Sequence, residues 1–216
     1  MLADSDAFYI SHIADVEYFP PPWFIYTGSR QKITGFMEQK EWLPVFTEDT
    51  VERLTGQDEG NFEFKNCYSV EGNIALRSLV SCNNLLVYLG CDGIYYFDGN
   101  TSKILNIPLS EYIRTNINSD YAYLSAGAFF DNKYLLSYPK GDSEVPNETI
   151  YIDFRNGNIG IYNFGFGSYC RWDKGTDGLQ LYSGSTTEGR VYSVLTGTSD
   201  YNESTEADDA ITCYDL

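Results

Sequence analysis

The sequence predicts an all-β fold, a β-propeller of four to five four-stranded antiparallel blades that form a complete or an incomplete ring. Aromatic residues make up 16% of the 216 residues, with 19 Tyr and 13 Phe, and such side chains favour pleated, half-buried surfaces. Short runs of β-branched and aromatic residues are separated by Gly, Asp and Asn, which are residues of tight turns. These runs also recur in groups of four along the chain.

The clearest of these groups lies at residues 85–99. Two apolar runs, 85–89 and 94–97, flank Asp92-Gly93, and Asp98-Gly99 follows the second run. We expect Asp92-Gly93 to form a two-residue hairpin turn, with Gly93 supplying the positive φ that such a turn requires.

Glycines mark the period of the repeat. A similar run ends at glycines 56, 99, 157 and 197, with spacings of 43, 58 and 40 residues, and the longest spacing contains a polar, Pro- and Gly-containing loop at 139–147. Periods of about 40–50 residues with four short strands are typical of propeller blades. A small sheet cannot bury both of its faces alone, whereas radially stacked sheets bury each face against a neighbour. A β-sandwich is the alternative, but it requires no four-strand period.

The pattern divides the chain into a single propeller domain, 1–216, with one partial and four full repeats. The partial blade is 1–31, with strand-like runs at 7–13 and 23–28, and the four blade-like repeats are 32–74, 75–121, 122–167 and 168–216. The expected strands of the four repeats are 32–37, 42–47, 50–56 and 62–65; 76–82, 85–90, 93–97 and 102–107; 123–130, 133–138, 149–154 and 159–164; and 169–173, 179–183, 190–194 and 210–214.

Three local features modify this pattern. Pro44 inside a strand predicts a bulge or a ladder position at which no N–H is required. The apolar spacing of 109–114 predicts one short helix. Residues 197–209 are acidic and rich in Ser and Thr, which predicts a loop before the last strand.

Charge and cysteine content limit the possible functions. The net charge of −17, from 31 acidic and 14 basic residues, argues against direct binding to nucleic-acid phosphates. The negative charge either keeps the protein soluble or forms an acidic docking face or lumen. We expect neither a secretion signal nor a membrane-spanning segment. The five cysteines show no CxxC spacing and are expected to be mostly reduced, although Cys82 and Cys91 flank one hairpin; they are Cys67, Cys82, Cys91, Cys170 and Cys213.

No residue pattern predicts a catalytic, cofactor-binding or metal site. His12 is the only histidine and lacks a recognisable nucleophile motif, so we expect a structural role for it. Paired carboxylates can hydrolyse glycosides, but turn chemistry explains most of the aspartates. Residues 200–204 lack the alternation of a calcium loop, which favours a solvated loop. The acidic residues near the start of the chain and at turns are Asp4, Asp6, Asp15, Glu17, Asp92, Asp98, Asp153 and Asp173.

The order of short motifs resembles the propeller repeats of tailed-bacteriophage tail proteins, such as the nozzle or tubular tail proteins of short-tailed phages. The residues that carry the resemblance are 8–11 with 19–20, 32–36, 43–46, 50–56, 72, 75, 77–80, 85–89, 92–95, 98–99, 128–139 and 150–153. Such proteins are usually longer, so this chain resembles either a fragment or a minimal version of them.

The resemblance implies a non-enzymatic structural or interaction protein of the virion tail, produced in the host cytoplasm. It also implies contact with other tail proteins and self-association into a ring. Like-charge repulsion in an acidic lumen would let DNA pass without adhering. The alternatives are a carbohydrate-binding or glycoside-processing propeller and a general protein-binding hub.

Overall fold

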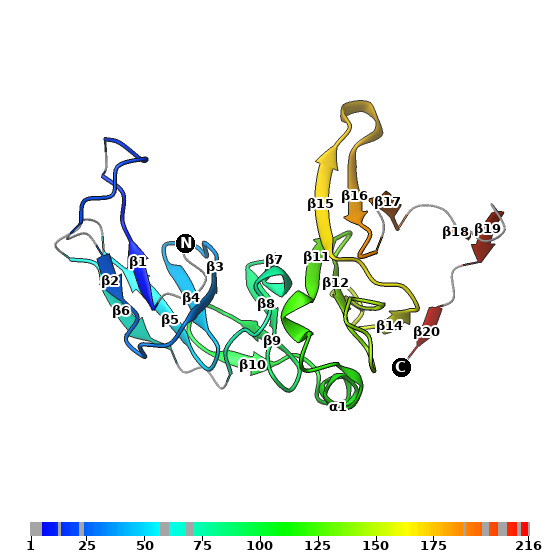
Figure 1. Cartoon of the computed structure of the whole chain (residues 1–216), viewed down its shortest axis with the longest axis horizontal. Helices are drawn as coiled ribbons and strands as arrows, with labels where there is room; N and C mark the ends of the chain where they lie inside the picture. The colour runs from blue at the N-terminus through cyan, green and yellow to red at the C-terminus, as the bar shows by residue number, and fades with distance from the viewer. Residues whose placement is uncertain are drawn as a thin grey trace. The chain divides into compact units, whose positions relative to one another are not determined.

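The computed structural model describes residues 6–12, 14–21, 24–56, 61–67, 71–187 and 189–195, and the backbone of 199–202, 207–210 and 213–215 (Figure 1). This part of the chain is all-β, with antiparallel sheets, one α-helix and three short 3-10 helices. The chain folds as two compact units, 1–115 and 116–216. A single propeller domain over 1–216 stays a prediction.

Unit 1 begins with a two-stranded sheet, β1 (Ala7–Tyr9) and β2 (Phe24–Tyr26), in which Phe8 lies opposite Ile25. Two four-stranded sheets follow, each an up-and-down meander in chain order. The first consists of β3 (Ile33–Phe36), β4 (Leu43–Thr47), β5 (Val51–Thr55) and β6 (Glu63–Asn66). The second consists of β7 (Val80–Cys82), β8 (Leu85–Leu89), β9 (Ile94–Phe97) and β10 (Ser102–Ile104).

The predicted helix is present and longer than expected. Helix α1 (Ile107–Asn116) follows β10, and the side-chain oxygen of Asn106 accepts the N–H of Leu109 at 2.9 Å, which caps the first turn. Leu109, Ser110 and Ile113 form its buried face. No helix in the described residues has the length and apolar character needed to cross a bilayer.

Unit 2 repeats the meander. One sheet consists of β11 (Ala126–Phe130), β12 (Lys133–Tyr138), β13 (Glu148–Asp153) and β14 (Ile159–Tyr162), with β20 (Cys213–Asp215) added beside β14. The next sheet has β15 (Ser168–Asp173), β16 (Leu179–Gly184) and β17 (Val191–Val194). A separate hairpin joins β18 (Ser199–Asn202) to β19 (Ala207–Ala210).

Turn geometry recurs at the same place in successive meanders. The β7–β8 turn is Asn83-Asn84, with φ of 48° and 69°, and the β11–β12 turn is Asp131-Asn132, with φ of 48° and 57°. Two central residues with positive φ are the signature of the type I′ turn, whose twist matches that of the flanking strands. The glycines that mark the repeat at 56, 99 and 157 all have positive φ, and the fourth, residue 197, lies outside the described residues.

The structure corrects several of the predicted elements. The run 76–82 starts as a 3-10 helix, Leu76–Ser78, and becomes extended only at Val80. The last expected strand, 210–214, does not complete the fourth sheet, because β20 pairs with β14 instead. The expected 197–209 loop contains β18 and β19. β4 runs straight through Pro44, and the register irregularity lies on the partner strand, between Ile33 and Gly35.

The two meanders of unit 1 share a hydrophobic core. The centre of the Phe46 ring, in the first sheet, lies 4.9 Å from the centre of the Tyr88 ring and 6.2 Å from that of Phe97, both in the second sheet. All three side chains are fully buried. The side-chain amide of Gln39 also donates to the carbonyls of Asn84, at 2.7 Å, and Phe97, at 3.3 Å. Apolar contacts and polar contacts to backbone therefore both join the two sheets.

Unit 2 contains an equivalent core. Ala128 and Leu135 of the β11–β14 sheet pack with Phe166, and with Leu181 and Val194 of the β15–β17 sheet. The hydroxyl of Ser137 lies 2.6 Å from that of Tyr169, which adds a hydrogen bond between the two sheets. Each unit therefore contains two successive meanders that bury apolar surface against each other.

Candidate functional site

Among the residues that the structure describes, acidic and cysteine side chains gather at the β8–β9 loop of unit 1. Leu89 pairs with Ile94, so the loop contains four residues, 90–93, closed by the N–H of Gly90 donating to the carbonyl of Gly93 at 2.8 Å. The predicted two-residue Asp92-Gly93 turn is therefore wrong, and Gly93 does not have a positive φ. Glycine is required for a different reason, because a Cβ at this position would lie 2.1 Å from the Oγ of Ser110 on α1.

Glu71, Cys91 and Asp92 come together at this loop. One potential ligand atom of each lies within 4.8 Å of the others, and Asp92 also accepts a hydrogen bond of 2.7 Å from the hydroxyl of Tyr95. Glu71 reaches the loop because the chain entering the second meander is anchored by the N–H of Ile74, which donates to the carbonyl of Leu89. The three side chains, here called the β8–β9 cluster, are partly open to solvent.

The environment favours the protonated forms of Glu71, Cys91 and the neighbouring Tyr95. Burial raises the pKa of Glu71, and the carboxylate of Asp92 raises it further. Burial, a hydrogen bond to Glu71 and the two neighbouring carboxylates raise the pKa of Cys91 to about 11. The pKa of Tyr95 is raised by burial and by its bond to Asp92. Cys91 is therefore a thiol at neutral pH and a poor nucleophile in this state.

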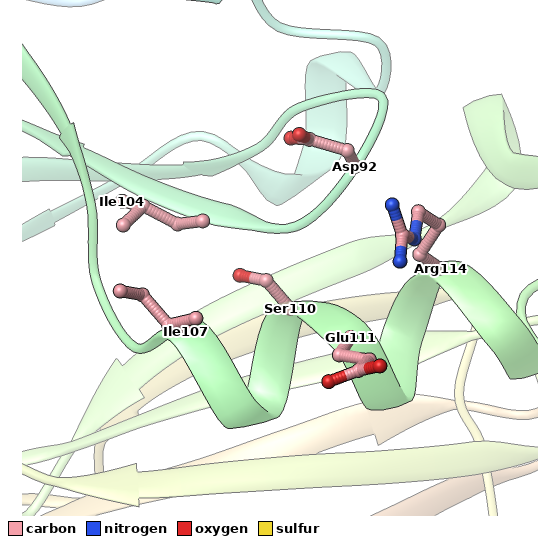
Figure 2. Close-up of a pocket in the computed structure, with 6 residues that line it drawn as sticks. All are labelled: Asp92, Ile104, Ile107, Ser110, Glu111 and Arg114. Atoms are coloured by element: carbon pink, nitrogen blue, oxygen red, sulfur yellow. The ribbon is translucent and has the colours of Figure 1, made fainter.

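A cavity of about 260 Å³ adjoins the cluster along α1. Figure 2 shows Ile104 and Ile107 at one end, Arg114 at the other, and Ser110 between them. Residues 107, 110, 111 and 114 are spaced three or four apart, so they lie along one face of the helix. The cavity combines an apolar end with a charged end that contains Asp92, Glu111 and Arg114.

The cluster supplies only part of the chemistry of a metal or hydrolytic site. Calcium takes six to eight oxygen ligands, and zinc binds cysteine as the thiolate, whereas this cluster offers two carboxylates and a protonated thiol. A glycoside-processing site requires two carboxyl groups that face one cleft. The 260 Å³ cavity is lined by Asp92 but not by Glu71, so this cavity does not bring the two carboxyl groups together.

Most of the sequence candidates make local bonds. The Nδ1 of His12 accepts the N–H of Ala14 at 3.1 Å within a short bridged turn. Asp98 accepts the N–H groups of Asn100 and Thr101, each at 2.9 Å.

Three further aspartates also make local or ionic contacts. Asp15 and Asp173 accept the N–H two residues ahead in their own turns, at 3.1 and 2.8 Å. Asp6 forms a 3.5 Å ion pair with Arg30. Asp4 and the side chains of 200–204 lie outside the described residues.

Asp153 and Arg155 form an ion pair at the turn after β13. The guanidinium of Arg155 donates to both carboxylate oxygens of Asp153, with Nη2 2.9 Å from Oδ2, and its own N–H donates to Oδ1 at 2.9 Å. These hydrogen bonds lower the pKa of Asp153 to about 2. The pair stabilises the turn after β13, and this agrees with the turn role that the sequence indicates for Asp153.

The cysteines bear out the expectation of reduced residues as far as their side chains are described. Cys67, Cys82, Cys91 and Cys170 form no disulfide. Cys82 is buried and Cys91 is exposed, so the hairpin they flank carries no disulfide.

Sequence reasoning missed Glu71 and the role of Arg114. Glu71 lies 20 residues before Cys91, outside every motif of the sequence, and only the folded backbone brings it to the loop. Arg114 belongs to the predicted helix, but its position on the cavity depends on how α1 packs against the β8–β9 loop.

No protein-family model matches this chain, and no curated protein matches its sequence.

Proposed function

We propose that this chain is a non-enzymatic structural and interaction protein, whose successive meanders are blades of a β-propeller in a bacteriophage tail. The observation that supports the proposal is the repeated antiparallel meander, four-stranded in three sheets and three-stranded in β15–β17, with sheets packed face against face in each unit. The aromatic and polar side chains of these meanders contribute to shared cores and turns.

The polar contacts between sheets support the same function. Gln39 is 4% exposed and bonds to carbonyls of the neighbouring sheet, and the Nη1 of Arg53 donates to the carbonyl of Gly99 at 3.1 Å. These contacts fix the sheets in orientation as well as in proximity, because hydrogen bonds are directional whereas apolar contact is not. Such fixed stacking suits a rigid assembly component.

The acidic composition supports a role near nucleic acid without adhesion to it. A chain of net charge −17 repels phosphate, so a passage formed by several copies would let DNA slide. The partners that we propose are other tail proteins and further copies of this chain.

Light scattering coupled to size exclusion tests the proposal on the full chain. Self-association predicts stable multiples of 24.5 kDa, with annular particles by negative-stain electron microscopy. A strictly monomeric chain at high concentration that also fails to bind proteins encoded by neighbouring genes would overturn it. Portal and adaptor genes beside this gene are the expected genomic context.

A further inference from the structure

Unit 1 contains a second and larger concavity, a groove of about 500 Å³ away from the β8–β9 cluster. Its walls come from three separate segments: residues 8–11 at the end of β1, the 38–43 turn before and into β4, and the end of β5 with Phe62. A volume of this size lies within the range of about 300–1,000 Å³ that is usual for small-molecule sites.

The inner surface of the groove is aromatic and apolar. Tyr9, Trp42 and Phe62 each come from a different wall, and Leu43 and Leu54 fill the space between them. Tyr9 is 52% exposed, whereas Trp42 and Phe62 are half-buried. The ring of Tyr9 contacts that of Phe24, with 6.0 Å between their centroids, and the exposed part of the Tyr9 ring offers contact area to a ligand.

Trp42 is held in place before any ligand arrives. The guanidinium of Arg53 lies 4.5 Å from the centre of its ring, and Arg53 is itself bonded to the carbonyl of Gly99. Gln39 and Trp42 also exchange two backbone hydrogen bonds, of 3.0 and 3.1 Å, across the turn. A fixed ring binds a ligand with a smaller loss of side-chain entropy.

Polar residues also line the groove. Glu38, Lys40 and Glu41 are exposed, and within the described residues neither carboxylate has a hydrogen bond or ion pair. Ser11 adds a hydroxyl from the 8–11 segment. The groove therefore presents several hydrogen-bond acceptors and a small excess of negative charge beside its aromatic rings.

We propose that this groove binds an uncharged oligosaccharide. A sugar ring has apolar C–H faces that stack on aromatic rings, and hydroxyl groups that donate to carboxylates. The two carboxylates and the strongly acidic chain disfavour phosphorylated, sulfated or sialylated glycans. The site binds without catalysis, and the inference is independent of whether the chain assembles into a ring.

The test is binding of the full chain to an array of uncharged gluco-, manno-, galacto- and N-acetylglucosamine oligosaccharides, set beside sialylated and sulfated ones. We expect binding to one uncharged class and none to the charged glycans. The best uncharged oligosaccharide is then titrated by calorimetry, and saturation-transfer NMR should show contact with its C–H protons. No binding to any uncharged oligosaccharide at millimolar concentration overturns the proposal.

Two variants locate the site. Tyr9→Ala and Glu41→Gln should each weaken binding about tenfold, because one removes a stacking surface and the other a charged acceptor. The matched controls are Tyr123→Ala, an aromatic residue 59% exposed in unit 2, and Glu17→Gln, an exposed carboxylate outside the groove. Circular dichroism verifies that all four variants fold. Equal affinity in the groove variants and the controls would place the ligand elsewhere and overturn the assignment.

Discussion

Replacing Glu52 by Gln tests how the N-terminal segment is attached to the first meander. Glu52 lies on β5, is 1% exposed, and accepts the N–H groups of Gly28 and Ser29 at 2.7 and 2.8 Å. The two carboxylate oxygens are therefore each used by one backbone donor of the chain that leaves β2. Gln offers one acceptor oxygen and one NH₂ group, so one backbone donor would face another donor.

The size of the effect follows from these two bonds. A hydrogen bond to a charged group contributes about 1.5–3 kcal/mol, and a buried donor without a partner costs a further ~1–3 kcal/mol. Since Gln retains one weaker bond, we expect Glu52→Gln to lower the free energy of unfolding by about 2–4 kcal/mol. For a chain of this size that corresponds to a fall in melting temperature of roughly 4–16 °C.

Thermal and urea unfolding measure the loss, and hydrogen exchange of residues 24–31 tests its location. Exchange there should accelerate more than in unit 2, because the change frees this segment first. Glu63→Gln is the control, since its side chain is 69% exposed and paired only with Lys65 at 3.9 Å. A loss below about 0.5 kcal/mol, which is typical of surface substitutions, would refute the reasoning.

Three further predictions concern other contacts. Gly93→Ala should destabilise unit 1 by at least about 1–3 kcal/mol, because the new Cβ would overlap α1; an unchanged melting temperature would contradict the observed packing. Cys91 should react slowly with iodoacetamide at pH 8, and it should react faster in Glu71→Gln because the Glu71 carboxylate raises the pKa of the thiol. Mass spectrometry measures both rates, and equal rates in the two proteins would contradict this cause. The lowered pKa of Asp153 stabilises the fold above pH 4, and this stabilisation disappears as the pH falls towards 2. The variant Arg155→Met should move the pKa of Asp153, measured by NMR, back towards 3.8. An unchanged pKa of Asp153 in this variant would argue against Arg155 as the cause.

Local patterns predicted the strands well because turn residues and alternating side chains act over short distances. The glycines at 56, 99 and 157, which mark the period of the repeat in the sequence, all have positive φ in the structure. The helix at 109–114 was also found from its apolar spacing, and the structure extends it to 107–116.

The failures involve contacts between distant segments. Asp92-Gly93 has the sequence of a tight turn, yet the approach of Ser110 determines why glycine is needed there. β20 pairs with β14 across about 50 residues, and no local signal distinguishes that pairing from one with β17. Glu71 joins Cys91 and Asp92, and the groove joins three segments, in the same non-local way.

Gln39 and Arg53 reach across to the second meander by bonding to carbonyls of residues 84, 97 and 99, not to their side chains. Every amino acid supplies a carbonyl, so these attachments survive almost any mutation at the accepting positions that preserves the backbone path. Neighbouring repeats are therefore free to diverge during evolution without separating. Such tolerance would let the two meanders of unit 1 keep their attachment while their side chains change.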